Sequence, residues 1–384
     1  MWRWIGVLRF VVLSYSLLAA AAVHAAEITR IWLTHRTHEP TSIVVNWETP
    51  EPGNSIVHAA GGDQPLVKYA VEEQVTLHAV SIPLIGNAKT FRYRVQTGAD
   101  MSTEATFKAY AGDELRAAVV ADWQGRPNLD GLLQDNVHLL LTAGDNIANL
   151  HARCGAGVSD CTKPYGELID AYPALFRSTP LMPTLGNHDR EIRPRGGKPP
   201  AEPVYDVNAT AFRRFFPLPD EGWKWRFDLP QVGVRFVALD LNHISDQGTT
   251  WQTCHPLDKD SEQFRWYEQL MTGARPPWVI TLYNERNGTM RSQQGGAWER
   301  LFRRGTLAVS GFGYFAERAE ANGCTYYNTA LGTGAKYPDP QSKFFASVPS
   351  YLLLTIKPQR LVAQLKSLDG RVLDEREFLP PATR

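Results

Sequence analysis

Residues 181–189 are Leu-Met-Pro-Thr-Leu-Gly-Asn-His-Asp, an apolar run that stops at a glycine and three polar side chains. Two earlier runs have the same form: residues 117–121 are followed by Asp122, and residues 139–143 by Gly144-Asp145. Short apolar runs of this kind predict strands that are buried on both faces. Since ligands bind beyond the carboxyl ends of parallel strands, we expect these polar side chains to lie at one edge of a sheet.

The same pattern continues toward the carboxyl terminus, where apolar runs end at Asp240, Asn284 and Ser310. Helical periodicity predicts helices at Tyr165–Arg177, Asp260–Met271 and Ser292–Arg304. Three alternating segments at the end of the chain predict closing antiparallel strands, at residues 351–356, 360–367 and 371–378. Strands that alternate with helices predict an α/β domain over residues 112–384.

The region from residue 27 to 111 has a different pattern, with short alternating segments separated by turn clusters. The clusters are Thr49–Asn54 and Gly86-Asn87. This pattern predicts a small antiparallel β-sandwich. The expected strands are Ile28–Leu33, Ser42–Trp47, Ser55–His58, Val75–Val80, Thr90–Gln96 and Ala105–Ala109.

Residues 1–26 have the form of an export signal. Arg3 and Arg9 precede an apolar run from Phe10 to Ala22, and small residues follow this run. The alternative is a retained membrane anchor, but the run is short for a bilayer. We therefore expect a secreted or periplasmic protein whose mature chain has no membrane span.

Export would permit disulfides, and the four cysteines are an even number. Cys154 and Cys161, which have six residues between them, form one expected pair, and Cys254 and Cys324 form the other. This is one of three pairings that four cysteines allow.

The charge balance argues against nucleic acid as a partner. The sequence has 40 Lys and Arg against 40 Asp and Glu, so no basic excess is present to release counterions from a phosphate backbone.

Asp122, Asp145, Asn187 and His188 offer carboxylate, amide and imidazole donors at three successive strand ends. Two carboxylates can share a pair of cations that hold the attacking and leaving oxygens of a phosphoryl transfer. The alternative is that each side chain only caps the following turn. Their occurrence at three strand ends together favours a divalent-metal site.

Three stretches resemble the first three motifs of the calcineurin-like metallophosphoesterases: residues 119–123, 140–146 and 183–189. Within that family the sequence is most similar to the purple acid phosphatases, because residues 39–50 and 90–95 resemble their amino-terminal fibronectin-like domain. The resemblance covers nearly the whole mature chain. It implies an N-terminal all-β sandwich of the fibronectin type III kind, followed by an α/β metallophosphoesterase domain built as a two-sheet β-sandwich flanked by helices.

The resemblance also implies roles for individual residues. Asp122 would bind a first metal ion, Asp145 would bridge two ions, and Asn187 would bind the second. His188 would contact the phosphate of a phosphate ester substrate or protonate the leaving alkoxide, held in place by Asp189.

The later part of the chain departs from the family pattern. Ala148 stands where the purple branch has tyrosine, so no tyrosinate-to-iron colour is expected, and Gln124 stands where another family pattern has histidine. The expected metal-binding histidines are replaced in Tyr283-Asn284-Glu285 and in Gly311-Phe312-Gly313-Tyr314, and no histidine follows His255.

Each metal would therefore keep two of the expected protein ligands, which a hard cation such as Mg²⁺ tolerates better than zinc or iron. Asn284 is the substitute that we place among the metal ligands. Other candidate donors are Glu285, Tyr314, His151 and His243, whereas Phe312 cannot donate anything.

Two functions follow from these residues. The first is an exported metal-dependent phosphoesterase with a reduced metal site. The alternative is a noncatalytic relative that retains the fold and binds a ligand or partner, with or without metal. A third class, an adhesion or envelope-interaction protein, would use the sandwich and aromatics such as Trp223 and Trp225, although such residues more often belong to a core.

Overall fold

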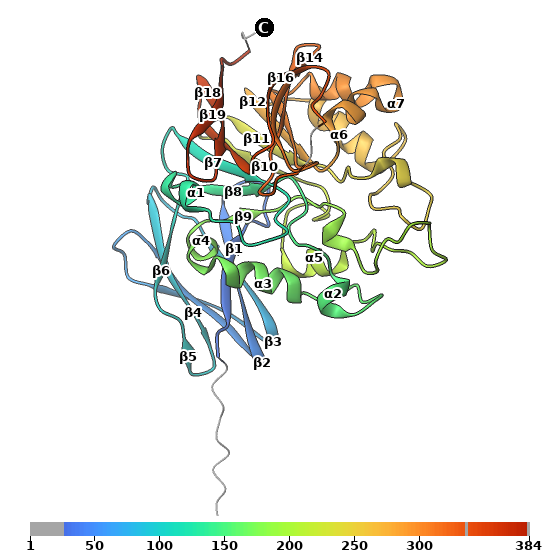
Figure 1. The fold of residues 1–384 in the computed structure, drawn as a ribbon. Coiled ribbons are helices and arrows are strands. Elements are labelled where there is room, and N and C mark those ends of the chain that lie inside the picture. The colour runs from blue at the N-terminus through green and yellow to red at the C-terminus, as the bar shows by residue number, and fades with distance from the viewer. Residues whose placement is uncertain (1–26, 335–336, 382–384) are drawn as a thin grey trace, which may run out of the picture.

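The computed structural model describes residues 27–334 and 337–381, and the expected export signal lies outside these ranges. The strands form three sheets, and one of them combines strands from the middle of the chain with the last three strands (Figure 1). In the described ranges, no helix is both long enough and apolar enough to span a bilayer.

The N-terminal region forms a six-stranded antiparallel sheet, and its hydrogen bonds join all six strands. The strands are β1 Arg30–Thr34, β2 Ser42–Gly61, β3 Val67–Pro83, β4 Thr90–Thr97, β5 Asp100–Met101 and β6 Ala105–Lys108. The turn expected at Thr49–Asn54 is wrong, because β2 runs through it and only its register with β3 shifts there. A bulge of this kind accommodates Pro50 and Pro52 without ending the strand.

Two mixed sheets form the rest of the molecule. One contains six strands in the order β19-β18-β17-β7-β8-β9, and the other contains seven in the order β10-β11-β12-β13-β15-β14-β16. Side chains from both sheets belong to one hydrophobic core, so the sheets pack face to face. The strands are β7 Leu115–Val120, β8 Leu139–Thr142, β9 Leu181–Met182, β10 Trp225–Leu229, β11 Val234–Ala238, β12 Trp278–Tyr283, β13 Leu307–Ser310, β14 Ala316–Ala321, β15 Cys324–Asn328, β16 Ser342–Ala346, β17 Ser350–Lys357, β18 Arg360–Ser367 and β19 Val372–Phe378.

The helices lie mainly in the connections between these strands. They are α1 Asp130–Gln134, α2 His151–Cys154, α3 Lys163–Ala171, α4 Pro173–Ser178, α5 Thr210–Phe215, α6 Glu262–Thr272 and α7 Asn287–Phe302, with short 3₁₀ turns η1 His188–Arg190 and η2 Ile244–Asp246. The single helix expected at Tyr165–Arg177 is two helices, because Pro173 cannot continue α3. Helix α7 starts earlier than expected and is interrupted at Gln293–Gly296.

The parallel strands bring their carboxyl ends together. β7 pairs with β8 so that Val120 lies opposite Thr142, and β8 continues the parallel pairing to β9. β12 and β13 are likewise parallel, with Tyr283 opposite Ser310. The residues that follow these strands therefore meet at one edge of the two sheets.

The N-terminal sheet packs directly on the rest of the chain. Trp32 on β1 is fully buried and stacks on Phe215 of α5, with ring centroids 4.2 Å apart. Arg30 on the same strand donates to Asp170 of α3, with Nη2 2.8 Å from Oδ2. Trp32 therefore belongs to the core of the α/β region rather than to that of its own sheet.

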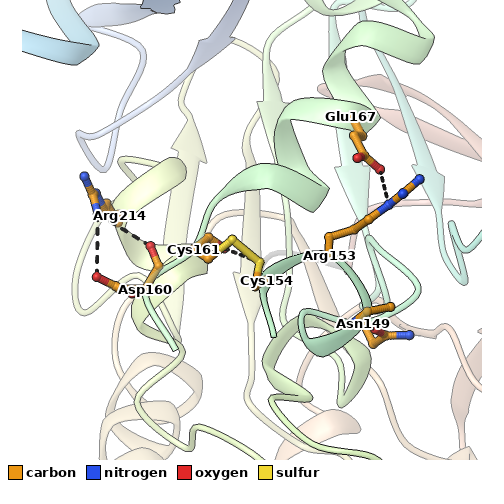
Figure 2. The surroundings of a disulfide bond; sticks show 8 residues. Asn149, Arg153, Cys154, Asp160, Cys161, Glu167 and Arg214 are labelled. Carbon is orange, nitrogen blue, oxygen red and sulfur yellow. Dashed lines mark hydrogen bonds and ion pairs between the residues drawn. A yellow bond between two sulfur atoms is a disulfide. The ribbon is translucent and has the colours of Figure 1, made fainter. Parts of the chain in front are cut away.

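One of the two expected disulfides is present. Cys154, at the end of α2, is bonded to Cys161, and the ion pairs of Arg153 with Glu167 and of Arg214 with Asp160 lie on either side (Figure 2). The Cys254–Cys324 pairing is wrong, since both thiols are free and buried. Cys324 is fixed opposite Ala321 in the β14–β15 hairpin, whereas the Cys254 sulfur lies 3.8 Å from Gln247 Nε2. Burial raises the pKa of each of these thiols to about 12.

Candidate functional site

Asp122 and Asp145 lie side by side beyond the ends of β7 and β8. The backbone pairing of the two strands continues into both loops, where Trp123 N donates to Asp145 O at 2.6 Å. Both aspartates have a left-handed backbone, with φ of 52° and 55°, which is uncommon outside glycine. Burial and then the neighbouring Asp145 carboxylate raise the pKa of Asp122 well above its usual range. Asp122 Oδ2 is buried and has no hydrogen-bond partner among the described residues.

Two glycines allow the loops to approach this carboxylate pair. A Cβ atom on Gly186 would lie 2.1 Å from Asp145 Oδ1, and one on Gly144 would lie 2.5 Å from Asn284 Cβ. Any other residue would displace these side chains, so glycine is required by close contact at both positions.

Asn187 and His188 reach the carboxylates through the loop after β9. The backbone N–H of His188 donates to Asp145 Oδ1 at 3.1 Å, which fixes the 3₁₀ turn η1 against the carboxylate. Asn187 is 6% exposed, and its side chain lies near Tyr205, whose pKa it tends to lower. Burial and the charge of Glu191 raise the pKa of Tyr205 to about 12, so the phenol stays protonated.

The side chain of His188 is held by two groups. Its Nδ1 hydrogen-bonds the Ala148 carbonyl and lies 3.4 Å from Glu191 Oε2. Burial alone would lower the pKa of His188, but Asp145, the Ala148 carbonyl and Glu191 together raise it. Glu191 also contacts His151, with Oε1 3.3 Å from Nε2.

Asp189 does not make the expected contact with the His188 side chain. Its carboxylate instead accepts from Gly186 N at 2.8 Å and from Asn146 Nδ2 at 2.9 Å. The physical reason is the tight turn after Gly186, which directs the Asp189 side chain back into the loop. Burial and the nearby Asp145 raise the pKa of Asp189 to about 7. Asp189 therefore stabilises the loops that carry Asp145 and His188.

Asn284 follows β12 and joins the two sheets at the site. Its Nδ2 donates to Ala143 O at 3.0 Å and also to the Gly311 carbonyl, while its Oδ1 is buried with no partner in the described part of the chain. The neighbouring Glu285 uses both carboxylate oxygens on backbone N–H groups, those of Ile244 and Arg286. Of these two residues, only Asn284 therefore keeps a free oxygen.

Tyr314 and Gln124, two positions at which the sequence comparison led us to expect histidine, are connected to each other. The Tyr314 hydroxyl donates to Gln124 Oε1 at 2.5 Å, and Gln124 Nε2 donates to Asp145 Oδ2 at 3.4 Å. The nearby backbone of Tyr314 partly opposes the rise in the pKa of Asp122. Gln124 therefore connects the Tyr314 hydroxyl to the Asp145 carboxylate.

Sequence reasoning missed Arg195, Glu191 and Tyr205 at this site. Arg195 stacks on Trp251, with the guanidinium carbon 4.5 Å from the ring centroid, and its Nη1 lies 3.4 Å from His243 Nδ1. Burial and the charge of Arg195 lower the pKa of His243. The charge of His188 lowers this pKa as well, whereas the charge of Asp145 raises it. The charged side chains of Glu191 and Arg195, a few residues after His188 in the sequence, could have indicated that both residues lie near the site.

The donors available to a metal ion are few. No group of three or more His, Cys, Asp and Glu side chains is placed to hold an ion within residues 27–334 and 337–381. The donor set at these strand ends is therefore the two carboxylates and the amide oxygens of Asn187 and Asn284.

Comparison with known proteins supports the fold alone. No protein-family model and no curated protein sequence matches this chain. A solved structure of PhoD is similar with a TM-score of 0.64 and 11% identity, covering 92% of this chain and 90% of that one. GAP50 of Plasmodium is a more remote likeness, with a TM-score of 0.45, 13% identity and coverage of 71% and 91%. The likeness to PhoD supports the predicted metallophosphoesterase-type α/β fold.

Proposed function

We propose that this protein is an exported metal-dependent phosphoesterase that hydrolyses phosphate esters with a reduced metal site. The observation that carries the proposal is the contact between the two buried carboxylates of Asp122 and Asp145. Two like charges in one buried site are unfavourable unless a proton or a cation neutralises them.

A hard divalent cation fits these residues. Two buried oxygens, Asp122 Oδ2 and Asn284 Oδ1, find no hydrogen-bond donor among the described residues, and such oxygens are the ligands that Mg²⁺ prefers. Asp122, Asp145, Asn187 and Asn284 would hold the ion or ions. Bound metal would neutralise the carboxylates and polarise a water molecule or a phosphoryl oxygen.

His188 is the residue that we assign to the substrate. Because Nδ1 is engaged by the Ala148 carbonyl and Glu191, Nε2 is the nitrogen left to contact a phosphoryl oxygen or to donate a proton to the leaving oxygen. Asp189 supports this role indirectly, since its hydrogen bonds to Gly186 and Asn146 hold the two loops together.

Export and the N-terminal region complete the proposal. The Cys154–Cys161 disulfide is consistent with an oxidising compartment, outside the cytosol.

We further propose that residues 27–111 are a fibronectin-like domain and that residues 112–384 are the catalytic domain, closest to the purple acid phosphatases. The antiparallel pairing of the N-terminal strands and their own core, which includes Trp47 and Tyr93, support this division.

The test is hydrolysis of 4-nitrophenyl phosphate by protein purified without chelator, together with metal analysis. We expect activity with Mg²⁺ or Mn²⁺ that Asp145→Ala abolishes and that the exposed control Asp113→Ala leaves unchanged. Absence of turnover with Mg²⁺, Mn²⁺, Zn²⁺ and Fe²⁺ over a wide pH range would reject the proposal in favour of the noncatalytic alternative.

A further inference from the structure

A pocket of about 360 Å³ lies between α7 and the loop that follows β13. Its walls include the rings of Phe312, Phe315 and Tyr337 and the guanidinium groups of Arg286 and Arg291. None of the residues assigned to the carboxylate centre lines this pocket, so it is a separate space with chemistry of its own.

The aromatic wall is fixed by one buried side chain. Asn328 is 2% exposed; its Oδ1 accepts from Phe312 N at 3.0 Å, and its Nδ2 donates to Phe315 O at 2.8 Å. The backbone on either side of Gly313 is therefore held before any ligand arrives, which lowers the entropy cost of binding.

Tyr337 and Arg286 add further flat surfaces to the pocket, an aromatic ring and a guanidinium plane. Tyr337 packs edge-on against Phe315 with ring centroids 5.5 Å apart, and the Arg286 guanidinium carbon lies 4.8 Å from the Tyr337 ring centroid. A guanidinium plane and ring faces are the surfaces on which another planar ring stacks.

Some polar groups of the pocket are already engaged. Arg291 Nη2 pairs with Asp339 Oδ1 at 2.7 Å, and Asn287 hydrogen-bonds Tyr283 and Tyr327. The Arg286 guanidinium, in contrast, has no ion pair with a carboxylate in the described residues. Within the part of the chain that the structure describes, the unpaired guanidinium of Arg286 and the buried, unpartnered Nη1 of Arg291 lie beside three aromatic rings, and this combination suits a planar, electron-rich group.

The pocket adjoins the carboxylate centre through two of its residues. The Phe312 ring centroid lies 6.0 Å from that of His243, whose imidazole feels the charges of Asp145 and His188. The Tyr337 hydroxyl packs on Gly313, where an added Cβ would lie 2.3 Å from it. Phe312 also directly follows Gly311, whose carbonyl accepts from Nδ2 of Asn284 at the centre, so a group bound here would lie beside that centre.

We propose that this pocket binds a planar aryl or heteroaryl group and that, in the reaction proposed above, this group is the one joined to phosphorus through the leaving oxygen. Its position as leaving-group subsite rests on the proposed function, whereas its affinity for an aromatic ring does not. Phe312 thus serves as a pocket wall at a position where the family has a metal-binding histidine.

The first experiment measures binding of 4-methylumbelliferone, which carries no phosphate, by fluorescence polarisation. We expect Phe312→Leu and Tyr337→Ala each to weaken the affinity about fivefold, the size of one lost stacking or cation–π contact. Phe378→Ala is the matched control, because it removes a ring that lies 5.3 Å from the Arg376 guanidinium on β19. Unchanged affinity in both pocket variants, or an equal loss in the control, would overturn the proposal.

The second experiment compares 4-methylumbelliferyl phosphate with glycerol 2-phosphate as substrates. Tyr337→Ala should raise KM for the aryl ester about fivefold and leave KM for the alkyl ester unchanged; equal changes for both esters would overturn the leaving-group assignment. If neither ester is hydrolysed while the binding difference persists, the proposed function fails and the aromatic site stands.

Discussion

Arg190 and Asp240 form a fully buried ion pair that connects the turn after His188 to the end of β11. Arg190 Nη2 lies 2.7 Å from Asp240 Oδ1, and both side chains are 0% exposed. Asp240 also accepts from the backbone N–H and the Nδ1 of His255. Burial would raise the pKa of Asp240, but Arg190 and His255 lower it.

Removing Arg190 leaves the Asp240 carboxylate buried without its guanidinium partner, with only His255 and Asn242 as hydrogen-bond donors among the other described residues. We expect Arg190→Met to lower the free energy of unfolding by about 3–5 kcal/mol, measured by urea denaturation. The control Arg265→Met breaks an exposed pair with Asp260 and should cost less than about 1 kcal/mol. Equal losses in the two variants would contradict a structural role for the buried pair.

The Asp122–Asp145 contact predicts opposite effects on stability and on activity. In the presence of EDTA, Asp122→Asn should stabilise the protein by about 1 kcal/mol, roughly 2 °C in Tm for a chain of this size, because it removes one of two adjacent buried charges. The same variant should lose metal affinity and phosphatase activity. A lower Tm of Asp122→Asn than of the wild type in EDTA would show that repulsion between the two carboxylates does not destabilise the metal-free protein.

Glu191 should position His188 rather than contact the substrate. We expect Glu191→Gln to reduce kcat about tenfold with little change in KM, and to move the alkaline limb of the pH–rate profile to lower pH, because protonated His188 loses a carboxylate 3.4 Å from its Nδ1. Glu167→Gln, which breaks the exposed pair with Arg153 (Figure 2), is the matched control. A pH profile identical to that of the wild type would contradict the positioning role.

Two buried histidines should make the protein sensitive to acid. Burial lowers the pKa of His35 and of His78 to about 4. Between about pH 6.5 and pH 4 the unfolded chain binds protons that the folded chain does not, so stability is complete above this range and falls through it. The loss is on the order of 3 kcal/mol per histidine when complete. His35→Gln should flatten the curve of unfolding free energy against pH, measured by urea denaturation; a curve of unchanged shape would contradict the role of His35.

The cysteines predict a simple thiol count. The native protein should not react with a thiol reagent, because Cys254 and Cys324 are buried, and the denatured protein should show two thiols. Cys154→Ser with Cys161→Ser should lower the free energy of unfolding by about 2–3 kcal/mol, the value for a short loop. A count of zero in the denatured protein would mean that the second pair is also bonded.

The early strands were predictable because each of their apolar runs ends at a residue that cannot continue a buried strand. Asp122, Asp145 and Asn187 stand directly after such runs, and parallel pairing then brings the strand ends together. Asp240 follows the same pattern, yet it is neutralised by Arg190 and does not join the carboxylate pair. A strand-end position therefore indicates where a side chain lies but not what it contacts.

The contacts of the loops could not be predicted, since they depend on turns and on residues distant in sequence. Asp189 is adjacent to His188 but hydrogen-bonds Asn146, 43 residues away. Similarly, Pro50 and Pro52 indicated a turn, whereas pairing with β3 on one side carries β2 through them. Tertiary pairing thus overrides the local signal.

The burial of Trp32 against Phe215 has a consequence for how the chain is made. Strand β1 is synthesised long before α5, so the Trp32 indole has no stacking partner until α5 has been made. Completion of the α/β core thus requires β1, the first strand of the described chain, to contact a helix that is made much later.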